Sequence, residues 1–255
     1  MSLNRNDRQI LSELIAMANR EPGLGLTPFQ SVASAHQYRQ LYAVWRRYVH
    51  TGASVLDWGV GNGHFSYYLV CKGYRVTGFS LEDCPLEARL DTEQYRLTSG
   101  APNEPVTLPF PNRSFDAVAS VGVLEHVRET GGSELASLQE IQRILRPGGR
   151  LLCYHLPNRY SLIEYLARRM PHKYHHPYRF TRRDIHNLLD EAELELLTTC
   201  RYGFLPRNIW GGMPAWLKDS TLAAGGWDAV DDGLGFIFNL ICQNHLFVAQ
   251  RRLEG

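Results

Sequence analysis

The sequence has almost no net charge and lacks a long hydrophobic run. Its 27 lysines and arginines nearly balance 26 acids, so the formal net charge is +1. A chain without an excess of one sign has no global field that would attract nucleic acid or a membrane. No early segment has the apolar core of a signal peptide, and no run reaches the length needed to cross a bilayer. We therefore expect a cytoplasmic protein that is not integral to a membrane.

Paired cysteines are missing as well. The five cysteines are scattered, odd in number and without a C-x-x-C motif. This pattern argues against a disulfide framework and a structural zinc site, and it suits a reducing compartment. The sequence also lacks internal repeats and low-complexity segments. Its 255 residues, 44% of them hydrophobic, predict one domain with a substantial core.

One stretch, VLDWGVGNGHFSYYL over residues 55–69, is strongly patterned. Apolar β-formers lead to Asp57, Gly59, Gly61 and Gly63 follow at alternate positions, and apolar residues then recur at helical spacing. This order predicts a strand, a tight turn and a helix. Alternating glycines let the backbone approach a flat ligand closely. The dinucleotide fingerprint G-x-G-x-x-G has a different spacing, and a carboxylate beside the loop would repel a pyrophosphate but attract an ammonium or sulfonium group.

At these residues the chain resembles the class I S-adenosylmethionine-dependent methyltransferases, whose first motif has the form D-x-G-x-G-x-G. The resemblance implies that Asp57 and the glycines Gly59, Gly61 and Gly63 hold the methionine end of the cofactor. The simpler alternative is a glycine-rich turn between a strand and a helix that binds no ligand, because short motifs also match by chance.

A second strand is predicted at residues 74–80, YRVTGFS. Members of the family usually end this strand with an acid that binds the ribose hydroxyls, whereas Ser80 occupies that position here. The resemblance implies that Glu82 or Asp83 reaches the ribose from the following loop; the alternative is that both are solvated loop acids. Family members also place an acid shortly before an L-P-F sequence, near the adenine amino group, which assigns that role to Glu104.

Two further strands complete the predicted ligand edge. Residues 114–127, SFDAVASVGVLEHV, predict a buried strand, a turn and the start of a helical region, and F-D and L-E-H-V are common at these places in the family. Residues 150–158, RLLCYHLPN, predict a further strand, which ends at His155. In parallel sheets, ligands bind beyond the carboxyl ends of the strands. The residues expected at that edge are Asp57, Ser80, Val121, His126 and His155, with Val121 assigned to the cofactor site.

Repeated strand–helix units favour a parallel sheet covered on both faces. The fold class is therefore α/β, and the resemblance implies a doubly wound, mostly parallel, Rossmann-like sheet of seven strands closed by an antiparallel strand at residues 245–252. Helices are predicted at residues 8–19, 31–50 and 181–189, and a loop at 204–235. The single domain, residues 4–253, divides into a helical cap (4–50), a cofactor-binding core (51–157), an inserted basic cap (158–183) and a C-terminal part with an acceptor-side loop (184–253).

Methyl transfer from a sulfonium is an in-line displacement for which the cofactor supplies the reactive group. The protein aligns the partners, and an oxygen nucleophile often needs a base, a task that suits histidine near neutral pH. His126 is our first candidate base and His155 the second; each is alternatively a structural histidine. The three histidines His172, His175 and His176 lack acids at helical spacing, so we expect a solvated or anion-facing cluster and no metal site.

The inserted segment is basic. Glu164 is the one acid among its cations, so an anionic acceptor held by arginine forks is predicted, with a solvated basic face as the alternative. Residues 161–170, SLIEYLARRM, are amphipathic and basic, which also permits a role at a membrane surface. Nucleic acid is disfavoured because the stripe is short. The cations are Arg159, Arg168, Arg169, Lys173, Arg179, Arg182 and Arg183.

The predicted function is methyl transfer from S-adenosylmethionine, most simply to an oxygen of a small-molecule, saccharide or lipid-linked acceptor. A non-catalytic S-adenosylmethionine-binding or interaction protein on the same fold is the first alternative, because the usual acid at the end of the second strand is missing. A nicotinamide-dependent oxidoreductase is the second, although it would favour a longer turn without Asp57. The sequence leaves the oligomeric state open.

Overall fold

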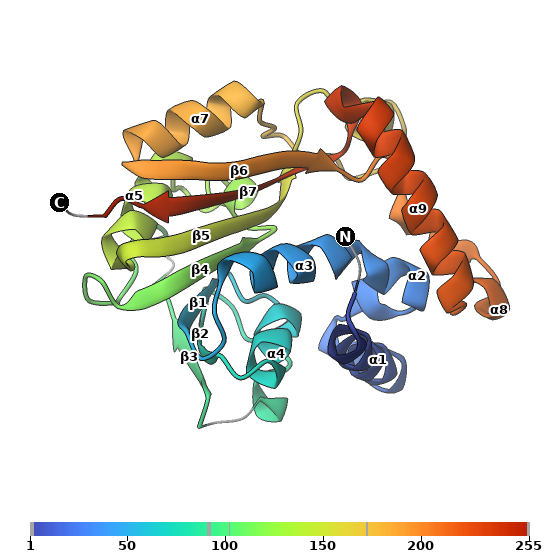
Figure 1. The fold of residues 1–255 in the computed structure, drawn as a ribbon, viewed down its shortest axis with the longest axis horizontal. Helices are drawn as coiled ribbons and strands as arrows, with labels where there is room; N and C mark the ends of the chain where they lie inside the picture. The colour runs from blue at the N-terminus through green and yellow to red at the C-terminus, as the bar shows by residue number, and fades with distance from the viewer. Residues whose placement is uncertain (1–2, 91–92, 102, 172, 254–255) are drawn as a thin grey trace.

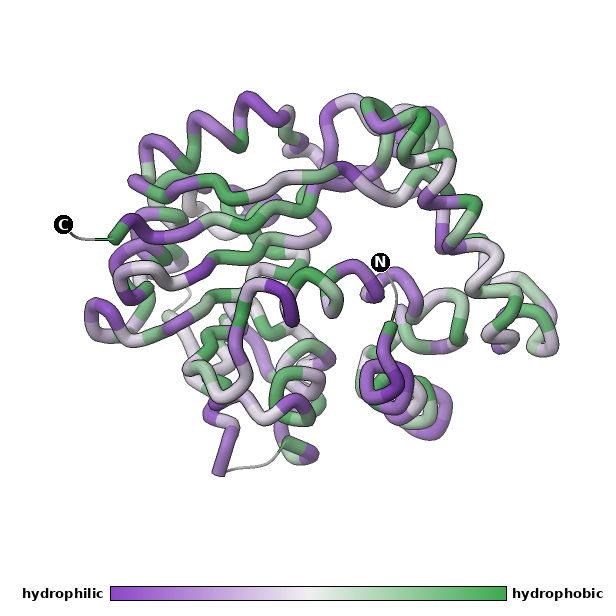
Figure 2. The backbone as a smooth tube through the Cα atoms, viewed as in Figure 1, coloured by the Kyte–Doolittle hydropathy of each residue, from purple (hydrophilic) through white to green (hydrophobic). Residues whose placement is uncertain are grey.

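The computed structural model describes residues 3–90, 93–101, 103–171 and 173–253. They are organised around one sheet of seven strands (Figure 1). Apolar residues dominate the central strands, as Figure 2 shows, because both faces of the sheet are covered. The strands are β1 (Ser54–Trp58), β2 (Arg75–Ser80), β3 (Tyr95–Ser99), β4 (Phe115–Val121), β5 (Leu145–Pro157), β6 (Leu194–Tyr202) and β7 (Asn244–Arg251).

The strand order is β3-β2-β1-β4-β5-β7-β6. The pairs β1–β2, β2–β3, β1–β4 and β4–β5 are parallel, whereas β7 runs antiparallel between β5 and β6. The order of strands reverses between β1 and β4, and a reversal of this kind leaves a crevice at the carboxyl ends of the strands. The predicted doubly wound, mostly parallel sheet with an antiparallel closing strand is confirmed.

Helices cover both faces of the sheet (Figure 1). Side chains of α1, α3 and α4 form one core cluster with the sheet, and side chains of α5 and α7 form the other. The helices are α1 (Arg5–Arg20), α2 (Val32–Ala35), α3 (Arg39–Tyr48), α4 (His64–Cys71), α5 (Glu134–Ile144), α6 (Leu162–Ala167), α7 (Arg182–Glu191), α8 (Ala215–Lys218) and α9 (Thr221–Ile237).

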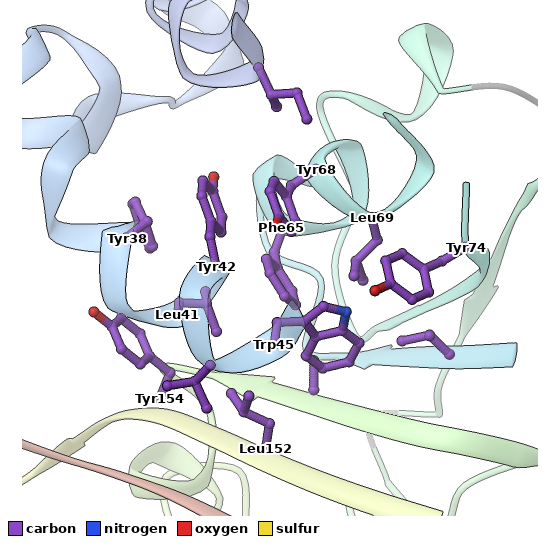
Figure 3. Close-up of a cluster of buried hydrophobic side chains, with 14 of the residues drawn as sticks. Tyr38, Leu41, Tyr42, Trp45, Phe65, Tyr68, Leu69, Tyr74, Leu152 and Tyr154 are labelled. Atoms are coloured by element: carbon purple, nitrogen blue, oxygen red, sulfur yellow. The ribbon is translucent and has the colours of Figure 1, made fainter. Parts of the chain in front are cut away.

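Aromatic side chains join the N-terminal helices to the sheet. The rings of Tyr42 on α3 and Tyr68 on α4 stack with their centroids 3.7 Å apart, and Trp45 lies edge-on to Phe65 at 5.3 Å. Figure 3 shows these four side chains facing one another between the helices. All four are buried. The aromatics of the N-terminal segment therefore act as core contacts, which makes this segment an integral part of the packed domain.

Two predicted elements differ from the structure. The helix expected at residues 31–50 is divided into α2, a 3-10 turn (His36–Tyr38) and α3. The loop expected at residues 204–235 contains α8 and most of the 17-residue α9, whose N-cap residue, Ser220, accepts a hydrogen bond from the Ala223 amide. Each glycine within a helix costs about 1 kcal/mol relative to alanine, so the glycines of this segment argued against a helix. Tertiary contacts outweigh that cost.

Ion pairs and a small apolar cluster that includes Ala224 hold α9 against the rest of the protein. Asp228 of α9 forms an ion pair with Arg39 on α3 at 3.0 Å, accepts a hydrogen bond of 2.5 Å from Arg207, and also contacts His36 at 2.8 Å. Burial would raise the pKa of Asp228, but the hydrogen bond with His36 and the charges of Arg207 and Arg39 together lower it from 3.8 to about 2. The next acid along the same face, Asp231, accepts hydrogen bonds from two backbone amides of the loop that follows β6. The face of α9 that meets the rest of the protein therefore combines paired acids with a small apolar cluster.

Among the residues that the structure describes, no helix is long and apolar enough to span a membrane.

Candidate functional site

The glycine turn after β1 is shaped by contacts with the ends of two neighbouring strands. The amides of Gly59 and Val60 donate hydrogen bonds to the carbonyl of Phe79 on β2, at 2.8 and 3.0 Å. Gly59 has φ +74°, and a Cβ placed on it would lie 2.5 Å from a methyl carbon of Val123, beyond β4. Gly61 has φ +51°, and the nearest atom to a Cβ there is 3.9 Å away. Gly59 is therefore required by packing, whereas Gly61 borders open space.

Asp57 lies under this turn. Its side chain is 2% exposed and accepts a hydrogen bond of 2.7 Å from the hydroxyl of Ser66 on α4. Burial raises the pKa of Asp57 from 3.8 to about 6, although the Ser66 hydrogen bonds oppose the shift. The carboxylate is therefore ionised at neutral pH at a cost in stability. An uncompensated buried anion of this kind favours a cationic group in the space above it.

The cost of the Asp57 charge gives a stability prediction. An acid whose pKa is higher in the folded than in the unfolded state contributes stability only while it is protonated, and that contribution is lost as the pH rises from 3.8 to about 6. Asp57→Asn, which is neutral and still accepts from Ser66, should therefore exceed the wild type in unfolding free energy at about pH 7 by on the order of 3 kcal/mol. The difference should vanish near pH 4. Chemical denaturation at the two pH values measures it, and equal stability at neutral pH contradicts it.

A cavity of about 290 Å³ opens beside the glycine turn. Gly61 lines it from the turn after β1, Glu82 from the loop after β2, and His126 from the 3-10 turn that follows β4. The cavity therefore lies at the reversal of strand order, where doubly wound sheets bind their ligands.

Some of the other predicted cofactor residues line this cavity and others do not. Ser80 lines it, and its hydroxyl accepts a hydrogen bond of 3.1 Å from the Glu82 amide, which leaves the exposed Glu82 carboxylate free to reach a ligand. Within the described residues, the lining includes neither Asp57, Glu104 nor Val121. The neighbours of the last two, Pro105 and Gly122, do line the cavity, so the predicted segments reach the site although these two side chains do not.

His126 lies at the rim of the cavity and belongs to a cluster of titratable groups. Its Nδ1 is 3.0 Å from a carboxylate oxygen of Glu129. The ring of His176, from the basic segment, has its centroid 5.8 Å away. Glu125 is 3% exposed, its Oε2 has no hydrogen-bond partner among the described residues, and burial raises its pKa to about 7. The sequence did not predict that Glu125 and His176 would meet at His126.

Two carboxylates orient the histidines of this cluster. Glu129 contacts Nδ1 of His126, and Glu164 of α6 contacts Nδ1 of His176 at 2.9 Å. Each contact leaves Nε2 of the histidine available. The ligand atoms of Glu125, His126 and His176 lie within 4.8 Å of one another. Two imidazoles and a carboxylate can hold a divalent cation, so the structure offers a metal arrangement that the sequence did not predict.

His155, the second candidate base, lies apart from the cofactor cavity. It has φ +68°, its Nδ1 is 3.0 Å from the hydroxyl of Tyr202, and its ring lies edge-on to Tyr38 at 5.6 Å. Burial lowers the pKa of His155 to about 3, with the positive charges of other histidines adding to the shift. An imidazole with this pKa is a weak proton acceptor at neutral pH. These contacts favour His126 over His155 as the base.

The basic segment contributes His176 to the site, whereas its outermost cations point to solvent. Arg168, Arg169 and Lys173 are all exposed, and the guanidinium of Arg169 stacks 3.6 Å over the ring of Tyr165. Arg159 and Arg179 line a separate cavity of about 380 Å³ beside α7. The charge of the segment is thus mostly directed away from the cofactor cavity.

Two of the curated relatives that match the chain are methyltransferases of known name. Demethylmenaquinone methyltransferase of Tropheryma whipplei (strain Twist) is 33% identical over 142 residues, which cover 49% of this chain and 55% of that protein. Ubiquinone biosynthesis O-methyltransferase of Pseudomonas entomophila (strain L48) is 27% identical over 146 residues, which cover 51% of this chain and 59% of that protein. The chain thus spans little more than half the length of these relatives.

Solved structures and a family model extend the comparison. The 1,6-didemethyltoxoflavin-N1-methyltransferase of Burkholderia thailandensis, crystallised with 1,6-didemethyltoxoflavin and S-adenosylhomocysteine, superposes with a TM-score of 0.57 at 17% identity. The match covers 99% of this chain and 92% of that one, and it shows a shared fold. A family model described as a methyltransferase domain matches residues 30–199, which include the glycine turn, Glu82 and the His126 cluster. The chain therefore belongs to the methyltransferase domain family.

Proposed function

We propose that this protein is an S-adenosylmethionine-dependent methyltransferase that transfers a methyl group to an oxygen of a small-molecule, saccharide or lipid-linked acceptor. One observation carries the proposal: the glycine turn, the acid after β2 and the candidate base His126 all line a single cavity of about 290 Å³. A cofactor held by the first two groups and an acceptor facing the third would meet there. Proximity of this kind is the main contribution that a protein makes to methyl transfer.

The residues around the cavity fit the cofactor. S-adenosylmethionine, when bound, supplies a methyl group on a positively charged sulfur. The open space at Gly61 admits a ligand against the backbone, and the buried charge of Asp57 below the turn attracts a cationic ligand. The exposed carboxylate of Glu82 can accept hydrogen bonds from ribose hydroxyls, the role that an acid at Ser80 would otherwise fill.

His126 is suited to remove the acceptor proton. A base acts best when a third group orients it and stabilises its charged form. Glu129, 3.0 Å from Nδ1, provides that support and leaves Nε2 to accept a proton.

An oxygen acceptor is also supported by a relative. The printed name of the Pseudomonas entomophila protein describes an O-methyltransferase of ubiquinone biosynthesis. Because the match covers 59% of that protein, its acceptor is only a guide to the class of acceptor used here. Incubation of the protein with methyl-labelled S-adenosylmethionine and fractionated cell extracts tests the function. Transfer of label to an extractable compound supports it, and cofactor binding without transfer to any fraction favours the non-catalytic alternative.

The charge of the acceptor can be tested on the basic segment. Reversal of Arg168, Arg169 and Lys173 to Glu should lower kcat/KM by about 10–100-fold for acidic acceptors, in a salt-sensitive manner, if these cations hold the acceptor. Neutral acceptors should be unaffected. Reversal of two exposed arginines on the sheet, Arg75 and Arg96, is the matched control. Equal kinetics of the triple variant on every acceptor contradict the anionic-acceptor prediction and assign the cations to the protein surface.

A further inference from the structure

Helix α9 exposes an apolar face of the kind that a helix packed on a protein normally buries. A helix packed on a protein normally turns its apolar stripe inward and its charges to solvent. In α9, Asp228 and Asp231 face the body of the protein, where Arg39 and Arg207 pair with them. Both acids lie on the same face as the buried Ala224 and are largely protected from solvent.

The outward face of α9 is apolar along its whole length. Its residues recur at spacings of three and four, which places them on one side of the helix. Every residue of this face is described and exposed, and none is charged. The largest are Leu222, Phe236 and Ile237, which are 85%, 86% and 70% exposed. The face comprises Leu222, Gly226, Ala229, Val230, Gly233, Phe236 and Ile237.

A second apolar segment lies next to the C-terminal end of this face. The side chain of Asn158, just before α6, donates hydrogen bonds to the carbonyls of Leu240 and Cys242, which follow α9, at 2.8 Å each. Figure 1 shows α9 at the edge of the molecule, away from the covered faces of the sheet. Exposed apolar residues on this scale mark an interaction surface. We call residues 159–170, which include α6, the α6 segment. Its exposed apolar side chains are Tyr160, Leu162, Tyr165, Leu166 and Met170, between 38% and 53% exposed.

The basic residues of the α6 segment indicate the kind of partner that binds this surface. The α6 segment carries exposed cations among its apolar side chains, namely Arg159, Arg168 and Arg169. Its one acid, Glu164, is occupied by the amide and Nδ1 of His176. Exposed tyrosines interleaved with arginines, beside an uncharged apolar helix face, are the composition of a site that enters the headgroup region of a bilayer. Basic residues near such a surface are attracted to anionic lipids.

We infer that the outward face of α9 and the α6 segment form a docking surface for an anionic lipid bilayer. The apolar side chains enter the interface between headgroups and acyl chains, and the arginines contact lipid phosphates. The protein binds the bilayer from one side without spanning it. This inference does not depend on methyl transfer itself, but it assigns Arg168 and Arg169 to lipid phosphates, whereas the anionic-acceptor prediction assigns them to the acceptor.

Vesicle co-sedimentation tests the docking surface. The wild type should partition onto vesicles of equal parts phosphatidylglycerol and phosphatidylcholine, and more weakly onto phosphatidylcholine alone. The double variant Phe236→Asp/Ile237→Asp should lose binding by about tenfold or more, since it removes two exposed apolar anchors and adds charge. Arg168→Glu/Arg169→Glu should lose the preference for anionic vesicles. Leu253→Asp, at another exposed apolar residue, is the matched control and should bind as the wild type does.

Three outcomes would overturn the inference. The first is a wild type that does not partition onto anionic vesicles. The second is a Phe236→Asp/Ile237→Asp variant that binds as the wild type does. The third is a stable dimer in light scattering that this variant converts to a monomer, because the face would then join two copies of the chain. Since both substituted residues are exposed, the variant should keep the circular dichroism spectrum and S-adenosylmethionine affinity of the wild type.

Discussion

Replacement of His126 by alanine should lower kcat by about 10²–10⁴-fold and leave the affinity for S-adenosylmethionine nearly unchanged. The imidazole lies at the rim of the cofactor cavity and is oriented by Glu129, so its loss removes the proposed proton acceptor. Because His126 is about one-third exposed, its truncation leaves little empty space in the core. The measurement is steady-state turnover with an acceptor identified by label transfer, together with cofactor calorimetry on the same variant.

Two controls separate a base from other roles of His126. His155→Ala tests the second candidate, whose buried and hydrogen-bonded ring predicts a loss of stability with a smaller effect on chemistry. Turnover should also survive prolonged treatment with a chelator. A chelator-sensitive reaction that added divalent metal restores would instead make His126 a ligand together with Glu125 and His176. Parallel loss of cofactor affinity and turnover in His126→Ala would make the residue structural.

Replacement of Asp57 by alanine should weaken S-adenosylmethionine binding by on the order of 2–4 kcal/mol, the range for removal of a partly desolvated charged partner. This corresponds to about 30–1,000-fold in Kd. The carboxylate lies under the glycine turn and is ionised above its pKa of about 6. Affinity in the wild type should therefore fall as the pH drops below about 6, where the charge is lost.

Asp57→Asn distinguishes charge from support of the turn. It keeps an acceptor for the Ser66 hydroxyl, which is fully buried and would lose its partner in Asp57→Ala. If charge attracts the cofactor, both variants lose affinity. If the Asp57→Asn variant binds the cofactor as well as the wild type does, the carboxylate only supports the turn. Unaltered affinity in Asp57→Ala would remove the residue from the cofactor site altogether.

The parts of the fold that follow local rules could be predicted from the sequence. The predicted strand at residues 74–80 and the predicted strand before His126 lie within two residues of β2 and β4. The alternating glycines after Asp57 form the turn that follows β1. The helix predicted at residues 181–189 is α7, and Thr181 and Asp184 form a capping box at its start. In each case residues close in sequence determine the structure, by apolar periodicity, backbone freedom or a cap. The carboxyl ends of parallel strands then meet by topology, which brought Ser80 and His126 to one cavity.

The remaining features depend on contacts between distant residues. Helix α9 was expected to be a loop because its glycines oppose a helix, and the arginines that pair with Asp228 come from residues 39 and 207. His176 was expected in a solvated cluster, whereas Glu164 orients it toward His126 across 50 residues of sequence. The residues L-E-H were recognised as a motif, but burial of Glu125 with an unpaired oxygen requires knowledge of the surrounding core. Periodicity does not encode such pairings.

Calorimetric titration of the wild-type protein with S-adenosylmethionine, and separately with NAD, directly tests the proposal that the cavity beside the glycine turn binds S-adenosylmethionine. We expect one equivalent of S-adenosylmethionine to bind and NAD to give no heat. The Gly61→Val variant should not bind S-adenosylmethionine, because the valine side chain fills the space beside the turn. A valine side chain would also be strained at the φ of +51° found at Gly61, so the circular dichroism of the variant must match the wild type before the comparison is made. If the wild type binds NAD in preference to S-adenosylmethionine, or binds neither compound, the proposed cofactor site is wrong.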